Sequence, residues 1–263
     1  MKGLKDLKIE EKLELYEKVK KLRKKGLSYE EIVKSLKVKV DPTTLSRWCR
    51  GLGKPTGSSL INVKPSPEFS YFLGALMGDG NIRKRIHNYQ YEIRLRVQDK
   101  DFAILFAKAI SKIVNKKIKL RKEKDFTRCG ERFLVSLSNK RLWEFLVSRS
   151  TTQLIRIAEK FPRWFLRGLF DAEGSSSSGV EFSNTNLVLI KEVSRLLRSL
   201  GINHKIKLKI KKGQKVKIRN KLYIARKNLY TIRISRKEDI RKFATLVGFG
   251  IKRKQKKIMS SLK

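Results

Sequence analysis

Two nine-residue stretches, at positions 72–80 and 166–174, carry nearly the same pattern. The first reads FLGALMGDG and the second reads LRGLFDAEG. Each is an apolar helical segment that ends in one carboxylate followed by glycine. Each also has small residues at i, i+4 spacing, which are Gly74 and Gly78 in the first stretch and Gly168 and Ala172 in the second. Because the copies lie far apart in the chain, the repeat indicates a duplicated unit of about half a domain.

The spacing of the small residues predicts how the two copies meet. Small residues four apart leave a strip of the helix nearly free of side chains, so two such helices can approach closely. Their C-terminal ends then bring Asp79 and Glu173 together, although the helix dipoles and mutual repulsion disfavour both carboxylates there. A cation between the acids resolves this conflict, and Mg²⁺ prefers oxygen ligands of this kind. One copy alone would instead indicate a core helix capped by a left-handed glycine.

The charge of the chain indicates a polyanionic partner. Its 65 Lys and Arg residues against 24 Asp and Glu residues give a formal net charge of +41. A Lys-rich bias of the thermophilic kind usually raises Glu alongside Lys, and this composition does not. The excess of positive charge therefore favours a nucleic acid as the partner.

Other features of the sequence predict a cytoplasmic, intracellular protein without a membrane partner. No apolar run approaches the length of a membrane helix, and the charged start MKGLKDLKIEEK is not typical of a signal peptide. The two cysteines, Cys49 and Cys129, lie far apart and lack zinc-type spacing, which is typical of reduced thiols. The length of 263 residues fits one domain of about 200 residues plus a small one.

Residues 1–53 are predicted to form a small all-α helix-turn-helix domain. A first helix covers residues 8–25, Ser28 and Glu31 form a capping box for a second, and Asp41–Pro42 begins a third. We expect the polar side chains of the third helix to face a DNA major groove. They are Thr43, Thr44, Ser46, Arg47 and Arg50. A three-helix bundle that is structural or binds protein is the alternative interpretation.

Residues 54–66, rich in Gly and Pro, form a predicted linker. The rest of the chain divides into two repeats, 67–158 and 159–263. In each repeat the periodicity predicts the order helix, two strands, helix, two strands, helix. The fold class is therefore α+β, with a duplicated αββαββα unit after the small helical domain.

Strand patterns in both repeats combine one apolar face with one basic face. In YQYEIRLRVQ (89–98), Arg94 and Arg96 alternate with apolar residues, and in HKIKLKIKK (204–212) lysines alternate with Ile and Leu. A strand face of lysines without interleaved acids is unusual for an ordinary solvated surface. We therefore expect these basic residues to contact double-stranded DNA. They are Arg94, Arg96, Lys205, Lys207, Lys209 and, from YTIRIS, Arg233.

The paired stretches resemble the signature of the LAGLIDADG homing endonucleases. LRGLFDAEG matches that signature at most positions, and FLGALMGDG matches it more loosely. A single chain with two motifs is similar to the monomeric, pseudo-twofold members of the family, from about Ser66 onwards. The resemblance implies that the two sheets form a saddle over the DNA, held together by the paired signature helices. It also implies metal-dependent hydrolysis of one phosphodiester on each strand.

The resemblance implies roles for particular residues. Mg²⁺ or Mn²⁺ would be held by Asp79 and Glu173, together with the backbone carbonyls of Gly78 and Ala172. Three more residues match positions that support the reaction in the family, and they are Gln98, Asn184 and Lys254. Each has a simpler interpretation, as a base contact, a helix cap and a phosphate contact respectively. The chain departs from some relatives because residues 175–178, directly after the second motif, are serines rather than a lysine.

Three functions are compatible with these features. The first is a site-specific DNA endonuclease of the homing type with an accessory helix-turn-helix domain. The second is a non-catalytic DNA-binding transcriptional regulator, because some bacterial sporulation regulators combine LAGLIDADG-like repeats with a helix-turn-helix domain. The third is a maturase that binds intron RNA. Retention of both acids favours the first, since a regulator has no reason to keep an electrostatically costly pair.

Overall fold

A computed structural model of the chain describes residues 2–7, 9–53, 55, 61, 63–85, 90–125, 130–176, 179–218 and 221–262. The chain divides into an N-terminal unit, Met1–Leu60, and a main unit, Ile61–Lys263. This division falls within the predicted linker 54–66, of which residues 54, 56–60 and 62 lie outside the described part. Within the described residues, no helix has the length and apolar character that a membrane crossing requires.

The described part of the N-terminal unit consists of three α-helices and one short strand pair. The helices are α1 (Ile9–Lys24), α2 (Tyr29–Ser35) and α3 (Pro42–Cys49). A 3₁₀ turn, η1 (Leu4–Asp6), follows β1 (Lys2–Gly3), which pairs in parallel with β2 (Val38–Lys39). Tyr16 and Trp48 meet edge to face in the core, with ring centroids 5.6 Å apart.

Local capping explains where these helices begin. The Ser28 hydroxyl accepts a hydrogen bond from the Glu31 backbone N–H, and the Glu31 carboxylate accepts one from the Ser28 N–H. The Asp41 carboxylate accepts a hydrogen bond from the Thr43 N–H at 2.8 Å, directly before α3. Such caps satisfy N–H groups that have no partner inside the helix. The predicted starts of α2 and α3 are therefore confirmed.

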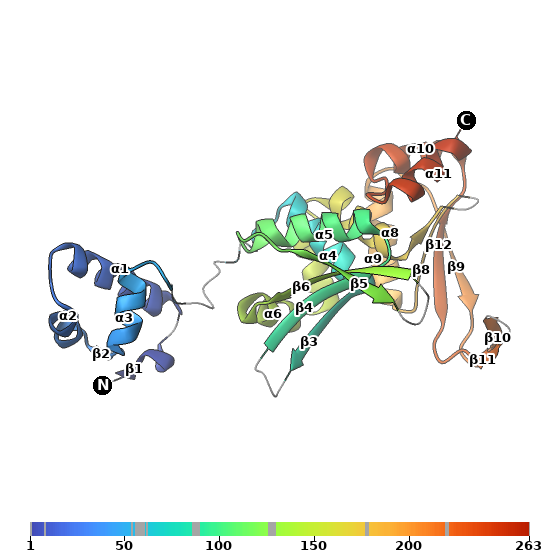
Figure 1. Ribbon diagram of the computed structural model, residues 1–263. Coiled ribbons are helices and arrows are strands. Elements are labelled where there is room, and N and C mark those ends of the chain that lie inside the picture. The colour runs from blue at the N-terminus through green and yellow to red at the C-terminus, as the bar shows by residue number, and fades with distance from the viewer. Residues whose placement is uncertain are drawn as a thin grey trace. The chain divides into compact units, whose positions relative to one another are not determined.

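The main unit consists of two repeats with the same order of elements (Figure 1). The first repeat contains α4 (Pro67–Asp79), β3 (Gly80–Arg85), β4 (Gln90–Val97), α5 (Lys100–Ile113), β5 (Leu120–Asp125), β6 (Gly130–Ser138), α6 (Lys140–Val147) and α7 (Thr151–Ala158). Its antiparallel sheet has the strand order β3-β4-β6-β5. Within the described part of the main unit, α4, α5 and α6 pack on one face of this sheet, and no helix of that unit covers the opposite, free face.

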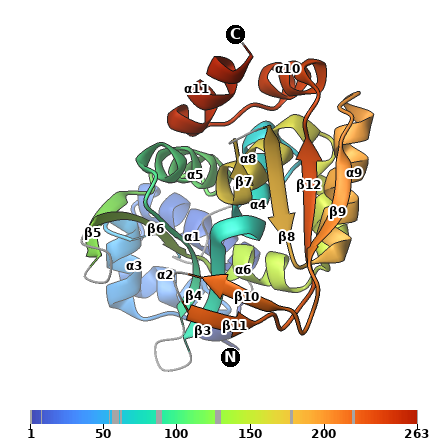
Figure 2. The same ribbon diagram turned by 90° about the vertical axis from the view of Figure 1, so that its right-hand side faces the viewer.

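The second repeat has the equivalent strand order, β7-β8-β12-β9. Its elements are α8 (Pro162–Glu173), β7 (Gly174–Ser175), β8 (Val180–Asn184), α9 (Leu187–Ser199), β9 (Lys205–Ile210), β12 (Leu229–Ile234), α10 (Lys237–Leu246) and α11 (Lys252–Ser261). A two-stranded ribbon of β10 (Lys215–Ile218) and β11 (Lys221–Ile224) is inserted between β9 and β12 (Figure 2). The predicted duplication and α+β class are confirmed, whereas α7, α10 and the ribbon were not predicted.

Helices α4 and α8 pack against each other so closely that glycine is required where they meet. A Cβ atom added at Gly74 would lie 2.1 Å from the carbonyl oxygen of Phe165. A Cβ atom added at Gly168 would lie 2.3 Å from the carbonyl oxygen of Tyr71. The packing is reciprocal, because Gly74 meets the backbone of α8 and Gly168 meets the backbone of α4. The predicted close approach of the two helices is confirmed.

The glycines that follow the two acids do not adopt the left-handed conformation that is expected of a glycine helix cap. Gly80 and Gly174 are extended, with φ of −75° and −78°, so a left-handed cap is the wrong interpretation at both positions. A Cβ atom at Gly80 would lie 2.5 Å from Leu76 Cα, and one at Gly174 would lie 2.4 Å from the Phe170 carbonyl oxygen. At both positions glycine therefore lets the backbone turn sharply from the helix into the strand that follows.

Candidate active site

The last residues of α4 and α8 are the two acids Asp79 and Glu173, which lie exposed at the surface. Neighbouring protein partly removes water from both carboxylates, and this raises the pKa of each. The negative charge of Asp79 raises the pKa of Glu173 further. The interlocked helices thus place the two acids close enough to repel each other.

Lys254, from α11, brings a buried positive charge next to these acids. Its ammonium group donates hydrogen bonds to the backbone carbonyls of Phe170 (3.3 Å) and Asp171 (2.7 Å), at the C-terminal end of α8. Burial lowers the pKa of Lys254, and the nearby charges of Asp171, Asp99 and Asp79 oppose that shift. The positive charge of Lys254 accordingly opposes the rise in the pKa of Asp79 and of Glu173, but does not cancel it.

Asp171 ties three helices together beneath the exposed acids. Its buried carboxylate accepts a hydrogen bond from the Tyr71 hydroxyl at 2.8 Å, which joins α8 to α4. It also accepts bonds from the backbone N–H groups of Gly250 (2.8 Å) and Ile251 (3.2 Å), directly before α11. Burial raises the pKa of Asp171 to about 6, against the opposing effect of these hydrogen bonds. The residue thereby fixes the start of the helix that carries Lys254.

Asp99 and Arg253 form a second tie, between the two repeats. The Arg253 guanidinium donates to both carboxylate oxygens of Asp99, at 2.8 and 2.9 Å, and this fork lowers the pKa of Asp99. The negative charge of Asp99 also raises the pKa of Asp79. Since Arg253 precedes Lys254, the pair anchors α11 of the second repeat on the first repeat, beside the acids.

The donor set at the helix ends consists of oxygen atoms. Gly78 and Ala172 lie among the last four residues of α4 and α8, where backbone carbonyls have no partner inside the helix. Among the residues that the structure describes, no three His, Cys, Asp or Glu side chains gather as a possible metal site. Mg²⁺ and Mn²⁺ suit carboxylates, carbonyls and water, and Mg²⁺ commonly uses one or two carboxylates plus substrate phosphates. The residues present therefore fit such an ion.

Gln98 and Asn184 occupy corresponding places just after Val97 of β4 and at the end of β8. Gln98 is exposed and precedes Asp99, whose charge acts on Asp79. The Asn184 side chain accepts a hydrogen bond from the Asn186 N–H at 2.8 Å, and Asn186 in turn caps α9. The simpler interpretation of Asn184 as the helix cap is therefore wrong, because Asn186 is the N-cap of α9 and Asn184 only accepts a hydrogen bond from it.

The free face of the first sheet is basic, with two of its arginines paired to acids. Cross-strand register places Arg94 opposite Asn81 and Ser136, and Arg96 opposite Leu134. Arg96 forms an ion pair with Glu123 at 2.8 Å, and Arg83 forms one with Glu92. The basic face predicted from the strand pattern is present, although it contains acids as well.

The free face of the second sheet carries the predicted lysines. Lys205 and Lys207 of β9 lie opposite Arg233 and Thr231 of β12. Glu181 of β8 forms ion pairs with Arg233 (3.3 Å) and Lys209 (3.8 Å). No acid is interleaved with the lysines along β9 itself, but the sheet brings Glu181 to them from β8. The net charge of this face remains positive.

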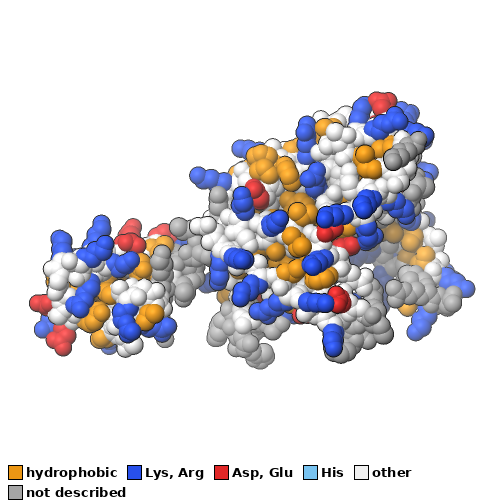
Figure 3. All heavy atoms as spheres, turned by 45° about the horizontal axis from the view of Figure 1, so that its top comes forward, with side chains coloured by type: hydrophobic (Ala, Val, Ile, Leu, Met, Phe, Trp, Pro, Cys, Tyr) orange, Lys and Arg blue, Asp and Glu red, His pale blue; other side chains and the backbone are white. Residues whose placement is uncertain are grey.

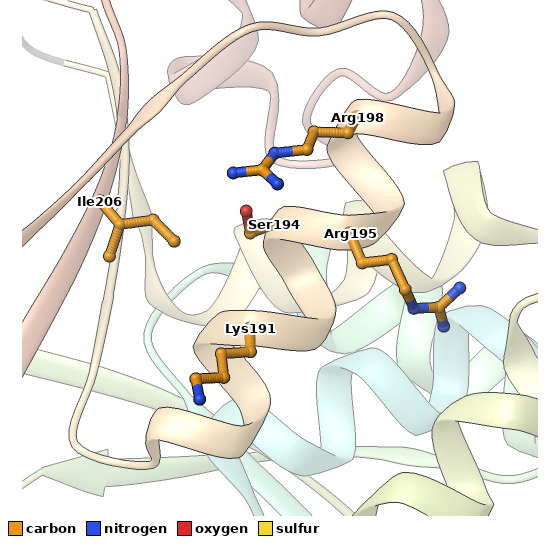
Figure 4. A pocket seen from close by; sticks show the side chains of 5 residues that line it. All are labelled: Lys191, Ser194, Arg195, Arg198 and Ile206. Atoms are coloured by element: carbon orange, nitrogen blue, oxygen red, sulfur yellow. The ribbon is translucent and has the colours of Figure 1, made fainter.

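The apolar side of β9 is less covered than its pattern predicts. Ile206 and Leu208 are 41% and 49% exposed. Ile206 borders a small cavity next to α9, where Lys191 and Arg198 extend on the same side of the helix as Ile206 (Figure 4). This cavity lies on the helical side of the sheet, away from the lysine face. Ile206 and Leu208 are exposed because β9 is the edge strand of its sheet.

Positive charge extends over the rest of the molecule. On the face drawn in Figure 3, Lys and Arg side chains greatly outnumber Asp and Glu. In the N-terminal unit, Thr43 and Arg47 are exposed on α3 and Arg50 is exposed directly after it, whereas Thr44 and Ser46 are half-buried. All five predicted DNA-binding residues of α3 therefore reach the surface at least in part.

Sequence reasoning missed three residues that organise the site, namely Tyr71, Asp99 and Arg253. Asp99 directly follows the predicted strand that ends in Gln98, and Arg253 precedes the predicted Lys254. Both therefore lie beside residues that the sequence did single out. The signal that connects them is absent from the sequence, because the ion pair spans 154 positions.

Comparison with known proteins identifies the class. Residues 160–248 match the LAGLIDADG-like domain family, and residues 69–130 match the WhiA LAGLIDADG-like domain family. The uncharacterized protein MJ0398 of Methanocaldococcus jannaschii is 38% identical over 269 residues, which cover 100% of this chain and 98% of that protein. The chain therefore belongs to a family of LAGLIDADG-like proteins that includes this archaeal relative.

Solved structures share the fold. A structure of mesophilic variants of the homing endonuclease I-DmoI has a TM-score of 0.52 and 23% identity, over 69% of this chain and 88% of that chain. I-DmoI in complex with DNA and Mn has a TM-score of 0.50 and 25% identity, over 71% of this chain and 98% of that chain. The chain is thus similar both to the homing endonuclease I-DmoI and to the WhiA LAGLIDADG-like domain family.

Proposed function

We propose that this protein is a site-specific, metal-dependent double-strand DNA endonuclease of the homing type. The observation that carries the proposal is the pair of acids at the ends of α4 and α8. Interlocked glycines place Asp79 and Glu173 together, and each carboxylate has a raised pKa there. A fold that only binds DNA gains nothing from such a pair of acids, whereas a metal-dependent nuclease uses adjacent carboxylates to hold its ions.

Asp79 and Glu173, with the carbonyl oxygens of Gly78 and Ala172, would hold Mg²⁺ or Mn²⁺. When bound, such an ion supplies an activated water and stabilises negative charge on the departing oxygen. Lys254 holds a fixed positive charge beside both acids and limits their protonation. In this proposal Gln98 and Asn184 orient water, one from each repeat.

The two sheet faces would position the duplex over these acids. Lysine and arginine side chains on β4, β9 and β12 neutralise phosphates, and arginine can also read guanine edges. These side chains are Arg94, Arg96, Lys205, Lys207, Lys209 and Arg233. In the N-terminal unit, α3 would act as a recognition helix through Thr43, Thr44, Ser46, Arg47 and Arg50.

A DNA-binding regulator on the same scaffold is the second candidate. Two observations favour it, namely the match of residues 69–130 to the WhiA LAGLIDADG-like domain and the serines that follow Glu173. Of those serines, Ser175 and Ser176 are described, and neither supplies a positive charge. The regulator predicts binding to a defined DNA site without cleavage in either Mg²⁺ or Mn²⁺.

Single substitutions of the two acids test the proposal. A target is first selected from a random duplex library by binding to the wild-type chain, and its cleavage is then measured in the presence of Mg²⁺. Asp79→Asn or Glu173→Gln should each lower the cleavage rate at least about a hundredfold, because several kcal/mol of transition-state stabilisation are lost. Affinity for the target should stay equal or increase, because repulsion between the acids and the phosphates is reduced.

Glu238→Gln is the matched control, since this acid lies exposed in the first turn of α10. It should cleave at the wild-type rate. If either acid variant cleaves as fast as the wild type, the site assignment is wrong. If the wild-type chain binds a selected DNA site and leaves it intact, the regulator is the better assignment.

A further inference from the structure

The β10–β11 ribbon breaks the symmetry of the two repeats. In the first repeat, the connection between β5 and β6 spans only residues 126–129, whereas the equivalent connection in the second repeat spans residues 211–228. Figure 1 draws the ribbon beyond the ends of β9 and β12, at the edge of the second sheet. An insertion that projects from only one repeat adds nothing to the shared core of the two.

The base of the ribbon is held by specific hydrogen bonds. The Gly213 N–H donates to the Ala225 carbonyl at 2.8 Å, and the Ala225 N–H donates to the Gln214 carbonyl at 3.0 Å. The Asn228 side chain accepts from the Lys212 N–H at 2.7 Å and donates to the Tyr230 hydroxyl at 3.2 Å. These bonds give the ribbon a defined direction relative to β12, which lowers the ordering cost of binding.

The ribbon combines positive charge with exposed apolar side chains. The segment 211–227, KKGQKVKIRNKLYIARK, contains eight Lys or Arg residues and no Asp or Glu. Leu222 and Ile224 are 65% and 66% exposed. Register places Lys217 opposite Leu222 and Lys215 opposite Ile224, so these four side chains share one face. Contiguous exposed apolar patches on a protein surface mark sites of interaction with other molecules.

The positive charge of the ribbon indicates that its partner is a polyanion such as DNA. The two apolar side chains indicate which groove of the DNA the ribbon contacts. Of the four side chains of this face, only the two lysines carry a hydrogen-bond donor for base edges in a major groove, and the apolar pair carries none. Leucine and isoleucine flanked by lysines suit a minor groove instead, where apolar residues contact sugars or wedge between base steps and cations meet phosphates. A two-stranded ribbon is a shape with which proteins enter DNA grooves.

We propose that the β10–β11 ribbon binds the minor groove of the DNA that flanks the target, on the side of the second repeat. Lys215 and Lys217 contact phosphates, while Leu222 and Ile224 contact the floor and walls of the groove. The ribbon thereby extends the footprint beyond the two sheets in one direction only. This inference rests on the proposed DNA-binding function, and it adds an asymmetric flank to the target.

Hydroxyl-radical footprinting of the full chain on its selected target tests the inference. One variant combines Leu222→Ser with Ile224→Ser, and a second combines Lys215→Gln with Lys217→Gln. All four side chains are exposed, so the fold should persist, and circular dichroism verifies this. We expect both variants to lose protection of one flank while the central protection remains.

Salt dependence separates the two kinds of interaction. The lysine variant should lower the slope of log affinity against log salt by about 2, and the removal of each lysine–phosphate pair should weaken binding about fivefold at 0.15 M salt. The serine variant should weaken binding roughly tenfold without changing that slope. The matched control, Lys191→Gln with Arg198→Gln, removes two charges from α9, on the helical side of the second sheet (Figure 4), and should keep the complete footprint.

Three outcomes would decide against the ribbon's binding to DNA or separate it from the nuclease proposal. If both ribbon variants protect the flank as the wild type does, the inference is overturned. This holds even if the wild type cleaves the target and the nuclease proposal is supported. Wild-type binding without cleavage rejects the nuclease, while the footprints of the variants still decide the ribbon. Unchanged DNA footprints together with a loss of self-association in sedimentation would make the ribbon a protein interface, and would overturn the inference.

Discussion

The absence of a side chain at Gly74 and Gly168 allows helices α4 and α8 of the two repeats to pack against each other. Each glycine faces a backbone carbonyl of the opposite helix, so no side-chain rotation could make room for a methyl group. The sequence predicted this packing because two small residues recur at helical spacing in both copies. It could not predict Tyr71, whose partner Asp171 lies 100 positions away and whose bond depends on the register of the packed helices.

Gly74→Ala should lower the free energy of unfolding of the main unit by about 3 kcal/mol, because the helices must separate to admit the added carbon. Urea denaturation measures this change. Gly53→Ala is the control, since its added Cβ atom would have a nearest neighbour at 4.0 Å, and it should change stability by less than about 0.5 kcal/mol. Equal stability of the two variants would contradict the packing argument.

At the scale of elements, prediction succeeded where a segment is amphipathic and has clear caps. The strand β4, which was predicted within 89–98, and the helices that begin near Lys100 and Leu187 all have one buried face. The ribbon could not be recognised by the same signal, because a two-stranded ribbon buries no core and its alternating lysines resemble those of β9. Helix α7 did carry a signal in the sequence, which is the capping box of Ser150 and Gln153.

The junction of α9 and β9 has a pH-sensitive bond. His204 Nε2 lies 2.7 Å from the Ser194 hydroxyl, and Nδ1 lies 3.0 Å from the Ile202 carbonyl oxygen. Burial lowers the pKa of His204, and the positive charge of Arg198 adds to this effect while Asp239 opposes it. Since the folded pKa is below the unfolded one, the neutral ring contributes stability above about pH 6.5 that is lost as pH falls.

His204→Gln should therefore remove a pH dependence of stability. Glutamine can still bond to Ser194, but it does not titrate. We expect the difference in free energy of unfolding between wild type and variant to shift in favour of the variant as pH falls from 7.5 to 5.5. Denaturation curves at several pH values measure the difference. A difference that is constant over this range would show that His204 titrates alike in both states.

At the scale of the whole molecule, the two units have separate cores. One apolar cluster draws its buried residues from Leu15 to Trp48, and the other from Phe69 to Ile258. The sequence predicted this division from the Gly- and Pro-rich stretch between them. It could not predict how the active-site helix α11 is anchored, because Arg253 and Asp99 meet only when both repeats have folded.

A chain that begins at Ile61 should fold and cleave the selected target with an unchanged rate once bound. Its affinity should fall because it lacks the basic α3 surface, and its binding should depend less steeply on salt because fewer phosphates are neutralised. Arg47→Ala in the full chain should reproduce part of this effect. Gel-shift and single-turnover cleavage assays measure both quantities. Equal affinity of the shortened and full chains would remove the proposed role of the N-terminal unit in DNA binding.

The hydrogen bond between Tyr71 and Asp171 distinguishes the two repeats from each other. At the equivalent positions the other copies carry Phe165 and Met77, which cannot form this bond. Two first repeats from different molecules would bury a tyrosine hydroxyl against methionine, and two second repeats would bury a carboxylate against phenylalanine, both at a cost. The first and second repeats are therefore complementary at this contact. Each repeat packs more favourably against the other than against a second copy of itself.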